Sequence, residues 1–95
     1  MTATATWQGS VIARSDRTQE VDGFVYFPPD TVDRRYLQAS QKRTECHWKG
    51  TASYFHVVVD GKVNQDAAWV YADPKPEAAH FSGWIAFWKG VEITR

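Results

Sequence analysis

The strongest constraint on the fold is the stretch YFHVVVDGKVNQDAAWVY, in which two runs rich in β-branched and aromatic residues flank Asp60-Gly61. An Asp-Gly dipeptide accepts the positive φ angles of a two-residue turn, so this stretch predicts a β-hairpin. If Val59 pairs with Lys62, alternation of the strand side chains places one set on a common face. That set is Tyr54, His56, Val58, Val63, Gln65, Ala67 and Trp69. One face of the hairpin is therefore expected to be aromatic.

The remaining Gly and Pro residues also fall between short apolar stretches, which is typical of a β protein. Residues 3–14 predict a hairpin or a bent pair of strands. Residues 20–27 predict two strand fragments that are broken at Asp22-Gly23. The segment GWIAFWKGVEITR predicts strands over 84–88 and 91–94.

Helix is expected to be minor. Pro28-Pro29 must end a strand, because proline cannot donate to a strand ladder. A short helix is predicted over 31–38, capped by Asp30 or Thr31, and a helical turn over 77–81. The expected fold is mainly β: a small single domain, residues 1–95, of antiparallel sheets with one or two short helices.

The composition limits the classes of partner. Eleven Lys and Arg balance eleven Asp and Glu, so no net charge attracts a polyanion, and nucleic acid is not an expected partner. A single cysteine excludes an internal disulfide, and the three histidines show no spacing typical of zinc ligands. Neither a structural metal nor a cofactor is expected.

The start of the chain, MTATATWQGS, lacks the charged residues and the apolar stretch of a signal peptide. No apolar run approaches the length that spans a bilayer, so no membrane partner is expected. The expected location is the reducing cytoplasm. The sequence leaves the oligomeric state open.

Residues spread over nearly the whole chain form a pattern with a specific order and spacing. They are Tyr26-Phe27-Pro28, Asp30, Leu37, Ser40, Thr44, Cys46, Lys49-Gly50, Ala52, Tyr54, Ala68-Trp69, Tyr71, Pro74, Gly83 and Ala86-Phe87. In this pattern the chain resembles the family catalogued as domain of unknown function 427. The resemblance implies a β-tent, in which two antiparallel sheets lean together. This architecture is shared with the thalidomide-binding domain of cereblon and with methionine sulfoxide reductases of the B type.

Two properties associated with the resemblance lack support in the residues. Many β-tent proteins hold their sheets with a four-cysteine zinc site, which a single cysteine cannot build. The family is sometimes labelled a nucleotidyltransferase. That chemistry needs acidic residues that hold a divalent metal over a triphosphate, usually with a glycine-rich or basic cradle, and no such pattern is found. The family also commonly has proline after the cysteine, where this chain has His47.

The stretch TECHWKG, residues 44–50, contains the only cysteine. If this stretch is extended, Thr44, Cys46 and Trp48 share one face of the strand. The residues between them lie on the opposite face, which Lys49 shares. The adjacent pair Cys46 and His47 is then a poor catalytic dyad, because the imidazole must reach the sulfur. His56 or His80, brought near in space, would be a better partner.

Three functions follow from these residues. The first is a small-molecule pocket with aromatic walls, for an anionic or nucleotide-like ligand. The alternative for these rings is that they pack in the core and bind nothing. Its expected lining residues are Tyr26, Thr44, Lys49, Tyr54, Trp69 and Tyr71, with Cys46 beside them. The second is an enzyme that uses Cys46 as nucleophile or redox centre, with a nearby histidine or Glu20 as acid or base. The third is an interaction module that docks a protein through Trp84 and Trp88.

Overall fold

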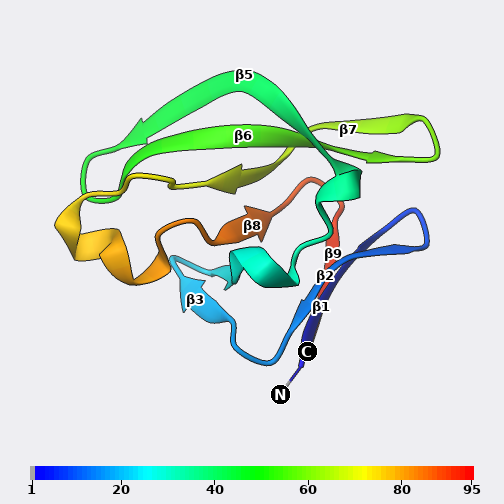
Figure 1. Ribbon diagram of the computed structural model, residues 1–95, viewed down its shortest axis with the longest axis horizontal. Helices are drawn as coiled ribbons and strands as arrows, with labels where there is room; N and C mark the ends of the chain where they lie inside the picture. Colours follow the sequence, from blue (N-terminus) through cyan, green and yellow to red (C-terminus); the bar gives the residue numbers. More distant parts are fainter. Residues whose placement is uncertain (1) are drawn as a thin grey trace.

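The computed structural model describes residues 2–95, so Met1, part of the expected domain 1–95, lies outside the described residues. Two antiparallel sheets form the fold (Figure 1). The smaller sheet has the order β2-β1-β9 and the larger has the order β3-β4-β8-β7-β6-β5. The strands are β1 (Ala3–Trp7), β2 (Ser10–Ser15), β3 (Gln19–Val21), β4 (Phe24–Phe27), β5 (Leu37–Cys46), β6 (Gly50–Val59), β7 (Lys62–Val70), β8 (Ile85–Phe87) and β9 (Glu92–Thr94). The expected mainly β fold is confirmed.

The helical content consists of three short 3-10 segments, η1 (Pro29–Thr31), η2 (Arg34–Tyr36) and η3 (Pro76–Phe81). The helical turn expected over 77–81 is confirmed within η3. The single helix expected over 31–38 is wrong, because the chain is extended between η1 and η2. No helical segment within residues 2–95 has the length and apolar character needed to cross a membrane.

Tertiary pairing explains why the chain between η1 and η2 is extended. Val32 forms an isolated β-bridge with Ala13, and the Asp33 N–H donates to the Ile12 carbonyl at 2.8 Å. Asp33 then caps η2, since its side chain accepts from the Arg35 N–H at 3.1 Å. The expected caps were Asp30 and Thr31, which instead lie inside η1, a segment without a side-chain cap.

The predicted β6–β7 hairpin is confirmed at its turn, where Val59 pairs with Lys62. Farther from the turn the register shifts, because β7 contains two more residues than the opposite stretch of β6. Tyr54 therefore pairs with Trp69. Ala67, which was expected beside Trp69, packs instead between the two sheets.

The register shift is centred on Asp66, whose φ angle of +56° is left-handed. Its backbone N–H donates to His56 Nδ1 at 3.0 Å, and its carboxylate accepts from Ser40 Oγ at 2.5 Å. Its carbonyl accepts from Trp88 Nε1 at 2.6 Å. A second irregularity lies beside it in β5, between Ala39 and Arg43. These bonds hold two neighbouring bulges in a fixed conformation.

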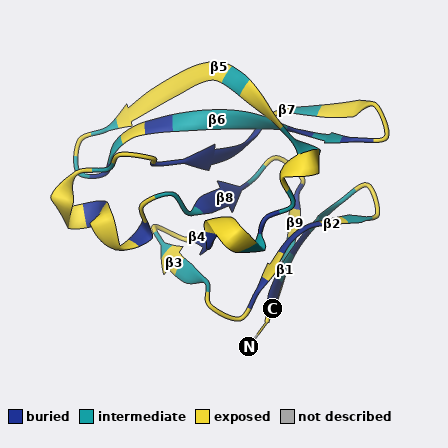
Figure 2. Ribbon diagram, in the orientation of Figure 1, coloured by how far each residue is buried: buried dark blue, intermediate teal, exposed yellow. Residues whose placement is uncertain are grey.

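The two sides of the larger sheet carry different side chains. Its side toward the smaller sheet packs in the inter-sheet cluster, to which both sheets contribute: Ala3, Ala5, Ile12, Ala13, Val25, Phe27, Val32, Val57, Val59, Ala67, Ala68, Val70, Ile85, Phe87 and Val91. The other side is the outer cluster: Tyr26, Ala52, Trp69, Tyr71, Ala78, Phe81 and Ala86, with Val21, Cys46, Trp48, Tyr54, Trp84 and Trp88 packed against it. Figure 2 shows the buried strands between these two sides and the exposed β5 at the edge.

Candidate functional site

The predicted site residues, apart from Glu20, come together on the outer side of the larger sheet. They come from four strands and from the turns that follow β5 and β7: Tyr26 in β4, Thr44 and Cys46 in β5, Lys49 and Tyr71 in turns, Tyr54 in β6 and Trp69 in β7. The alternation of side chains along each strand places the strand residues of this group on this side.

The rings at the centre of this group pack against one another. Trp69 Nε1 donates to the Tyr26 hydroxyl at 3.0 Å. The ring centroids of Tyr54 and Trp69 are 6.2 Å apart, and those of Phe24 and Trp69 are 4.9 Å apart in an edge arrangement. Tyr26 is fully buried and Trp69 is 7% exposed. These two rings are interior walls, so a ligand could reach them only from the rim of the cluster.

Part of that rim is formed by the pair Thr44 and Tyr54, whose hydroxyl oxygens lie 3.0 Å apart. Lys42 Nζ lies over the Tyr54 ring, 5.0 Å from its centroid. Thr44 is exposed and Tyr54 is half-buried. The rim therefore offers polar groups next to aromatic surface.

Lys49 reaches the outer cluster because β5 ends at Cys46 and the chain turns there. Cys46 pairs with Gly50, whose φ angle is +110°. A side chain at Gly50 would lie 3.3 Å from the backbone nitrogen of Lys75, and that N–H donates to the Lys49 carbonyl at 2.9 Å. The expectation that Lys49 faces away from Cys46 is wrong, since it assumed extended backbone through Trp48.

The Lys49 ammonium lies in a nearly closed surrounding of rings and one carboxylate. It is 5.4 Å from the centroid of Trp48 and 5.5 Å from that of Tyr71, within the range of cation–π attraction. Nζ lies 2.9 Å from Asp22 Oδ2. The whole residue is only 8% exposed.

Electrostatics keep Lys49 charged. Burial alone would lower the pKa of its ammonium, but the hydrogen bond to Asp22 and the nearby hydroxyls of Tyr26 and Tyr71 raise that pKa above its ordinary value. Lys49 is therefore a cation at neutral pH. Burial is the main cause that raises the pKa of both Tyr26 and Tyr71, so both hydroxyls are neutral at neutral pH.

Asp22 was not among the predicted site residues. It lies in the turn between β3 and β4 with a φ angle of +54°, and its side chain is 54% exposed. The Asp-Gly dipeptide indicated the turn correctly, but nothing in the sequence pairs Asp22 with Lys49. The signal that could have found it is the need of a buried lysine for a counterion.

Cys46 is half-buried against the outer cluster and has no histidine bonded to it within residues 2–95. His56 pairs with Gln38 and lies six residues along β6 from Gly50, the partner of Cys46, which separates it from Cys46 by about 20 Å. The His80 ring packs edge-on against Phe81, with 5.0 Å between the centroids. His47 contributes its backbone carbonyl, which accepts from Lys75 Nζ at 2.5 Å. Within residues 2–95, none of these contacts joins a histidine side chain to the Cys46 thiol.

Glu20 lies apart from these groups. It pairs with Val25, a residue of the inter-sheet cluster, and so projects from the side of β3 and β4 opposite to Tyr26. Its carboxylate forms an exposed ion pair with Arg95 Nη1 at 2.9 Å. These positions separate Glu20 from Cys46.

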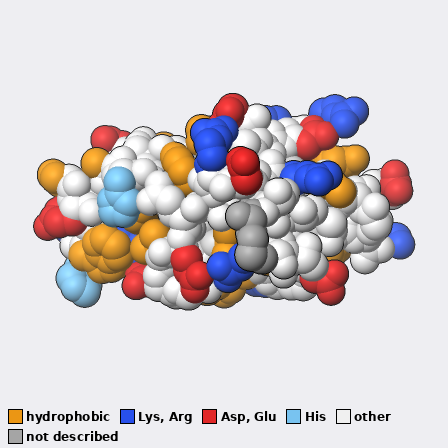
Figure 3. Space-filling model, turned by 90° about the horizontal axis from the view of Figure 1, so that it is seen from below, with side chains coloured by type: hydrophobic (Ala, Val, Ile, Leu, Met, Phe, Trp, Pro, Cys, Tyr) orange, Lys and Arg blue, Asp and Glu red, His pale blue; other side chains and the backbone are white. Residues whose placement is uncertain are grey.

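The tryptophans considered for docking are partly held by the protein itself. Trp88 donates its indole N–H to Asp66, and Lys89 Nζ lies 5.3 Å from the Trp88 ring centroid. Trp84 is half-buried against the outer cluster. Figure 3 shows, on one face of the molecule, acidic and basic side chains interspersed and hydrophobic side chains gathered beside histidine near one end.

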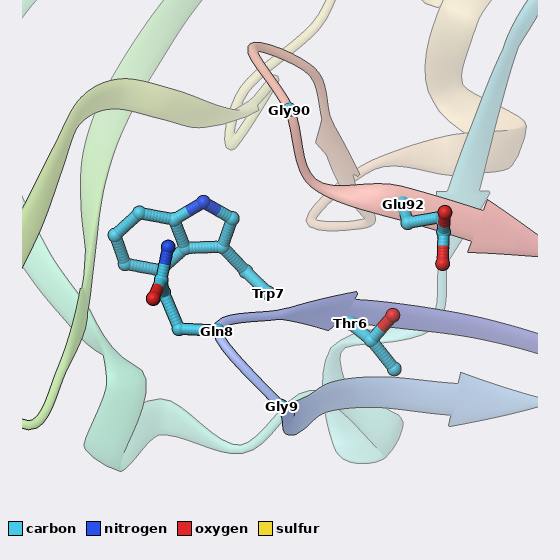
Figure 4. A pocket seen from close by; sticks show the side chains of 6 residues that line it. All are labelled: Thr6, Trp7, Gln8, Gly9, Gly90 and Glu92. Carbon is cyan, nitrogen blue, oxygen red and sulfur yellow. The ribbon is translucent and has the colours of Figure 1, made fainter.

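A separate hollow of about 480 Å³ lies at the turn between β1 and β2. Its lining is Thr6, Trp7, Gln8, Gly9, Gly90 and Glu92. Figure 4 shows Trp7 and Gln8 on one side and Thr6 and Glu92 on the other. The polar groups do not converge on one point, as a specific ligand site requires. In the part of the chain that the structure describes, no three His, Cys, Asp or Glu side chains are grouped to hold a metal ion.

Comparison with known proteins agrees with the resemblance of the sequence. No curated protein matches this chain. A family model described as "Domain of unknown function (DUF427)" matches residues 2–95. Since that match covers nearly the whole sequence, the protein belongs to the DUF427 family.

Proposed function

We propose that this domain binds a small anionic molecule at Lys49, on the aromatic outer side of the larger sheet. One observation carries the proposal: a nearly buried ammonium is balanced by a carboxylate that is itself half-exposed. A cation removed from water needs an anionic or hydrogen-bonded partner. Because Asp22 faces solvent, an anion from solution can take over that role.

The surroundings of Lys49 favour a ligand with an apolar body. The rings of Trp48 and Tyr71 lie beside the ammonium and give such a body aromatic surface to contact. Along the same side of the sheet, the hydroxyls of Thr44 and Tyr54 offer hydrogen bonds to polar groups of the ligand. Aromatic carboxylates and nucleotide-like molecules both fit this description. We place the domain in the cytoplasm, where a half-buried free thiol such as Cys46 stays reduced.

The test is a titration with benzoate and with adenosine monophosphate, followed by tryptophan fluorescence. Lys49→Met removes the charge and retains an apolar stem of similar length. Loss of a charge-assisted hydrogen bond is expected to weaken binding by about tenfold or more.

The matched control is Lys62→Met, because the Lys62 side chain lies on the exposed end of the β6–β7 hairpin, where its ammonium donates to Gln8 Oε1 at 3.3 Å. It should bind both probes as the unmodified protein does. If neither probe binds the unmodified protein, or if both variants bind equally well, Lys49 is not the anion site.

A further inference from the structure

We propose that the Asp22 carboxylate competes with the ligand for Lys49, because it binds the ammonium where the acid group of the ligand would bind. The ligand that displaces it is a monoanion, such as a carboxylate. This inference rests on the proposed function and specifies the class of its ligand.

The two partners of the ion pair differ in how firmly they are held. Lys49 is fixed by a tight turn against Lys75, and its side chain is 10% exposed. The Asp22 side chain is 54% exposed. If the pair separates, the ammonium cannot follow the carboxylate into water. An incoming anion therefore meets a cation that is already in position.

The segment that carries Asp22 is the easier one to move. The strand before it, β3, has three residues and lies at the edge of the sheet, paired only with β4. The next residue, Gly23, has open space around the position of a side chain, since no heavy atom lies within 4 Å of it. Gln19 and Val21 tie β3 to His80 and to the outer cluster, so the movement needed is confined to the exposed turn and the Asp22 side chain. Exposed turns open locally at low free energy. Asp22 can leave Lys49 while the rings of the outer cluster stay packed.

Charge counting then selects the ligand. Lys49 supplies one positive charge, while Tyr26 and Tyr71 are neutral neighbours. The other nearby lysine, Lys75, already donates to the His47 carbonyl. One negative charge balances the site. Lys49 is the cation held among the rings, and a second charge on the ligand would also meet the displaced Asp22 carboxylate, so a dianionic phosphate is disfavoured relative to a carboxylate.

The test compares benzoate, a monoanion, with phenyl phosphate, a dianion at mildly alkaline pH, by tryptophan fluorescence. Asp22→Asn retains an oxygen that can accept from Lys49 and a residue type that tolerates positive φ, but removes the charge. We expect benzoate to bind Asp22→Asn about fivefold more tightly than the unmodified protein, the effect of one half-exposed ion pair. The affinity for phenyl phosphate should rise by a larger factor, so that the ratio of the two affinities, which favours benzoate, becomes smaller in Asp22→Asn.

The matched control is Asp60→Asn. Asp60 has a φ angle of +50° and Gly61 one of +77°, close to the +54° and +83° of the Asp22-Gly23 turn. Asp60 has no ion pair with Lys49, whose carboxylate partner is Asp22. This variant should bind both probes as the unmodified protein does.

The outcomes separate this inference from the proposed function. If Lys49→Met abolishes binding but Asp22→Asn binds no more tightly than the unmodified protein, the anion site stands and the competitor does not. Weaker binding by Asp22→Asn would make Asp22 part of the ligand contacts and overturn the inference. No binding by any variant overturns both. Should Asp22→Asn fail to fold, Asp22→Gly also fits the positive φ and removes the carboxylate together with its acceptor, so tighter binding of benzoate is again expected.

Discussion

The two sides of the larger sheet are built from alternate residues of the same strands, yet they differ in chemistry. In β4, Phe27 points into the inter-sheet cluster and Tyr26 into the outer cluster; in β7, Val70 and Trp69 divide in the same way. The inter-sheet cluster consists of Ala, Val, Ile and Phe, which bury surface without polar atoms. The outer cluster consists largely of rings with polar tips. The inter-sheet side therefore contributes apolar burial alone, while the outer side combines burial with polar groups, which is the side on which we propose binding.

The largest expected effect would break the inter-sheet cluster. Phe27→Ala removes a fully buried ring that lies 5.8 Å from Phe87 between centroids. We expect the free energy of unfolding to fall by about 3–5 kcal/mol, a large part of the stability of a small domain. Chemical denaturation followed by circular dichroism measures the loss. A loss below that of Tyr26→Phe, the neighbouring position on the other side, would contradict the division of roles.

A smaller effect is expected from the polar tips of the outer cluster. Tyr26→Phe and Trp69→Phe each remove one partner of the buried hydrogen bond between these side chains. A double-mutant cycle should give a coupling energy of about 1 kcal/mol. Coupling near zero would mean that only ring packing joins the two residues. Phe27→Leu combined with Trp69→Phe is the control, because these residues lie on opposite sides of the sheet and should act additively.

The smallest effect comes from the ionisation of the buried tyrosines, which changes the free energy of unfolding only at alkaline pH. The pKa values of Tyr26 and Tyr71 are raised in the folded protein, mainly by burial. The unfolded chain therefore loses these protons first, so stability is complete below about pH 10 and falls as the pH rises further. The raised pKa of Lys49 acts in the same direction.

The ultraviolet absorbance of tyrosinate, measured against pH, tests whether the pKa values of Tyr26 and Tyr71 are raised in the folded protein. Of the four tyrosines, Tyr26 and Tyr71 should ionise above the ordinary range, and their late step should disappear when the chain is denatured. Tyr26→Phe should remove one of these late protons. If all four tyrosines titrate together in the folded protein, the outer cluster is open to water, and the contrast between the two sides is weaker than the burial indicates.

Local signals in the sequence were sufficient for most of the fold. The Asp60-Gly61 turn and its first pairs follow from residue types that accept positive φ. The register beyond them could not be predicted, because Asp66 adopts left-handed backbone only with the support of His56, Ser40 and Trp88. The same holds for residues 31–38, where long-range pairing to β2 overrides the helical pattern.

For the candidate site, alternation was enough to place Tyr54 and Trp69 on one side of the sheet, and the structure confirms that they are neighbours. It was not enough for Lys49, whose direction depends on a turn, nor for Asp22, whose partner is distant in the sequence. Contacts between turns of different hairpins produce no periodic pattern of residues in the sequence. The ligand-binding roles of these residues stay predictions.

The pairing of β1 with β9 has a consequence for how fast the protein can fold. Thr4 lies opposite Thr94, so the two ends of the described chain are side by side (Figure 1). This contact closes a loop that contains nearly every other element, and such closure is among the slowest steps available to a small β domain. The smaller sheet, which covers the inter-sheet cluster, must therefore be completed late. A chain that has not yet made this pairing exposes part of its inter-sheet cluster, and exposed apolar surface of this kind favours self-association.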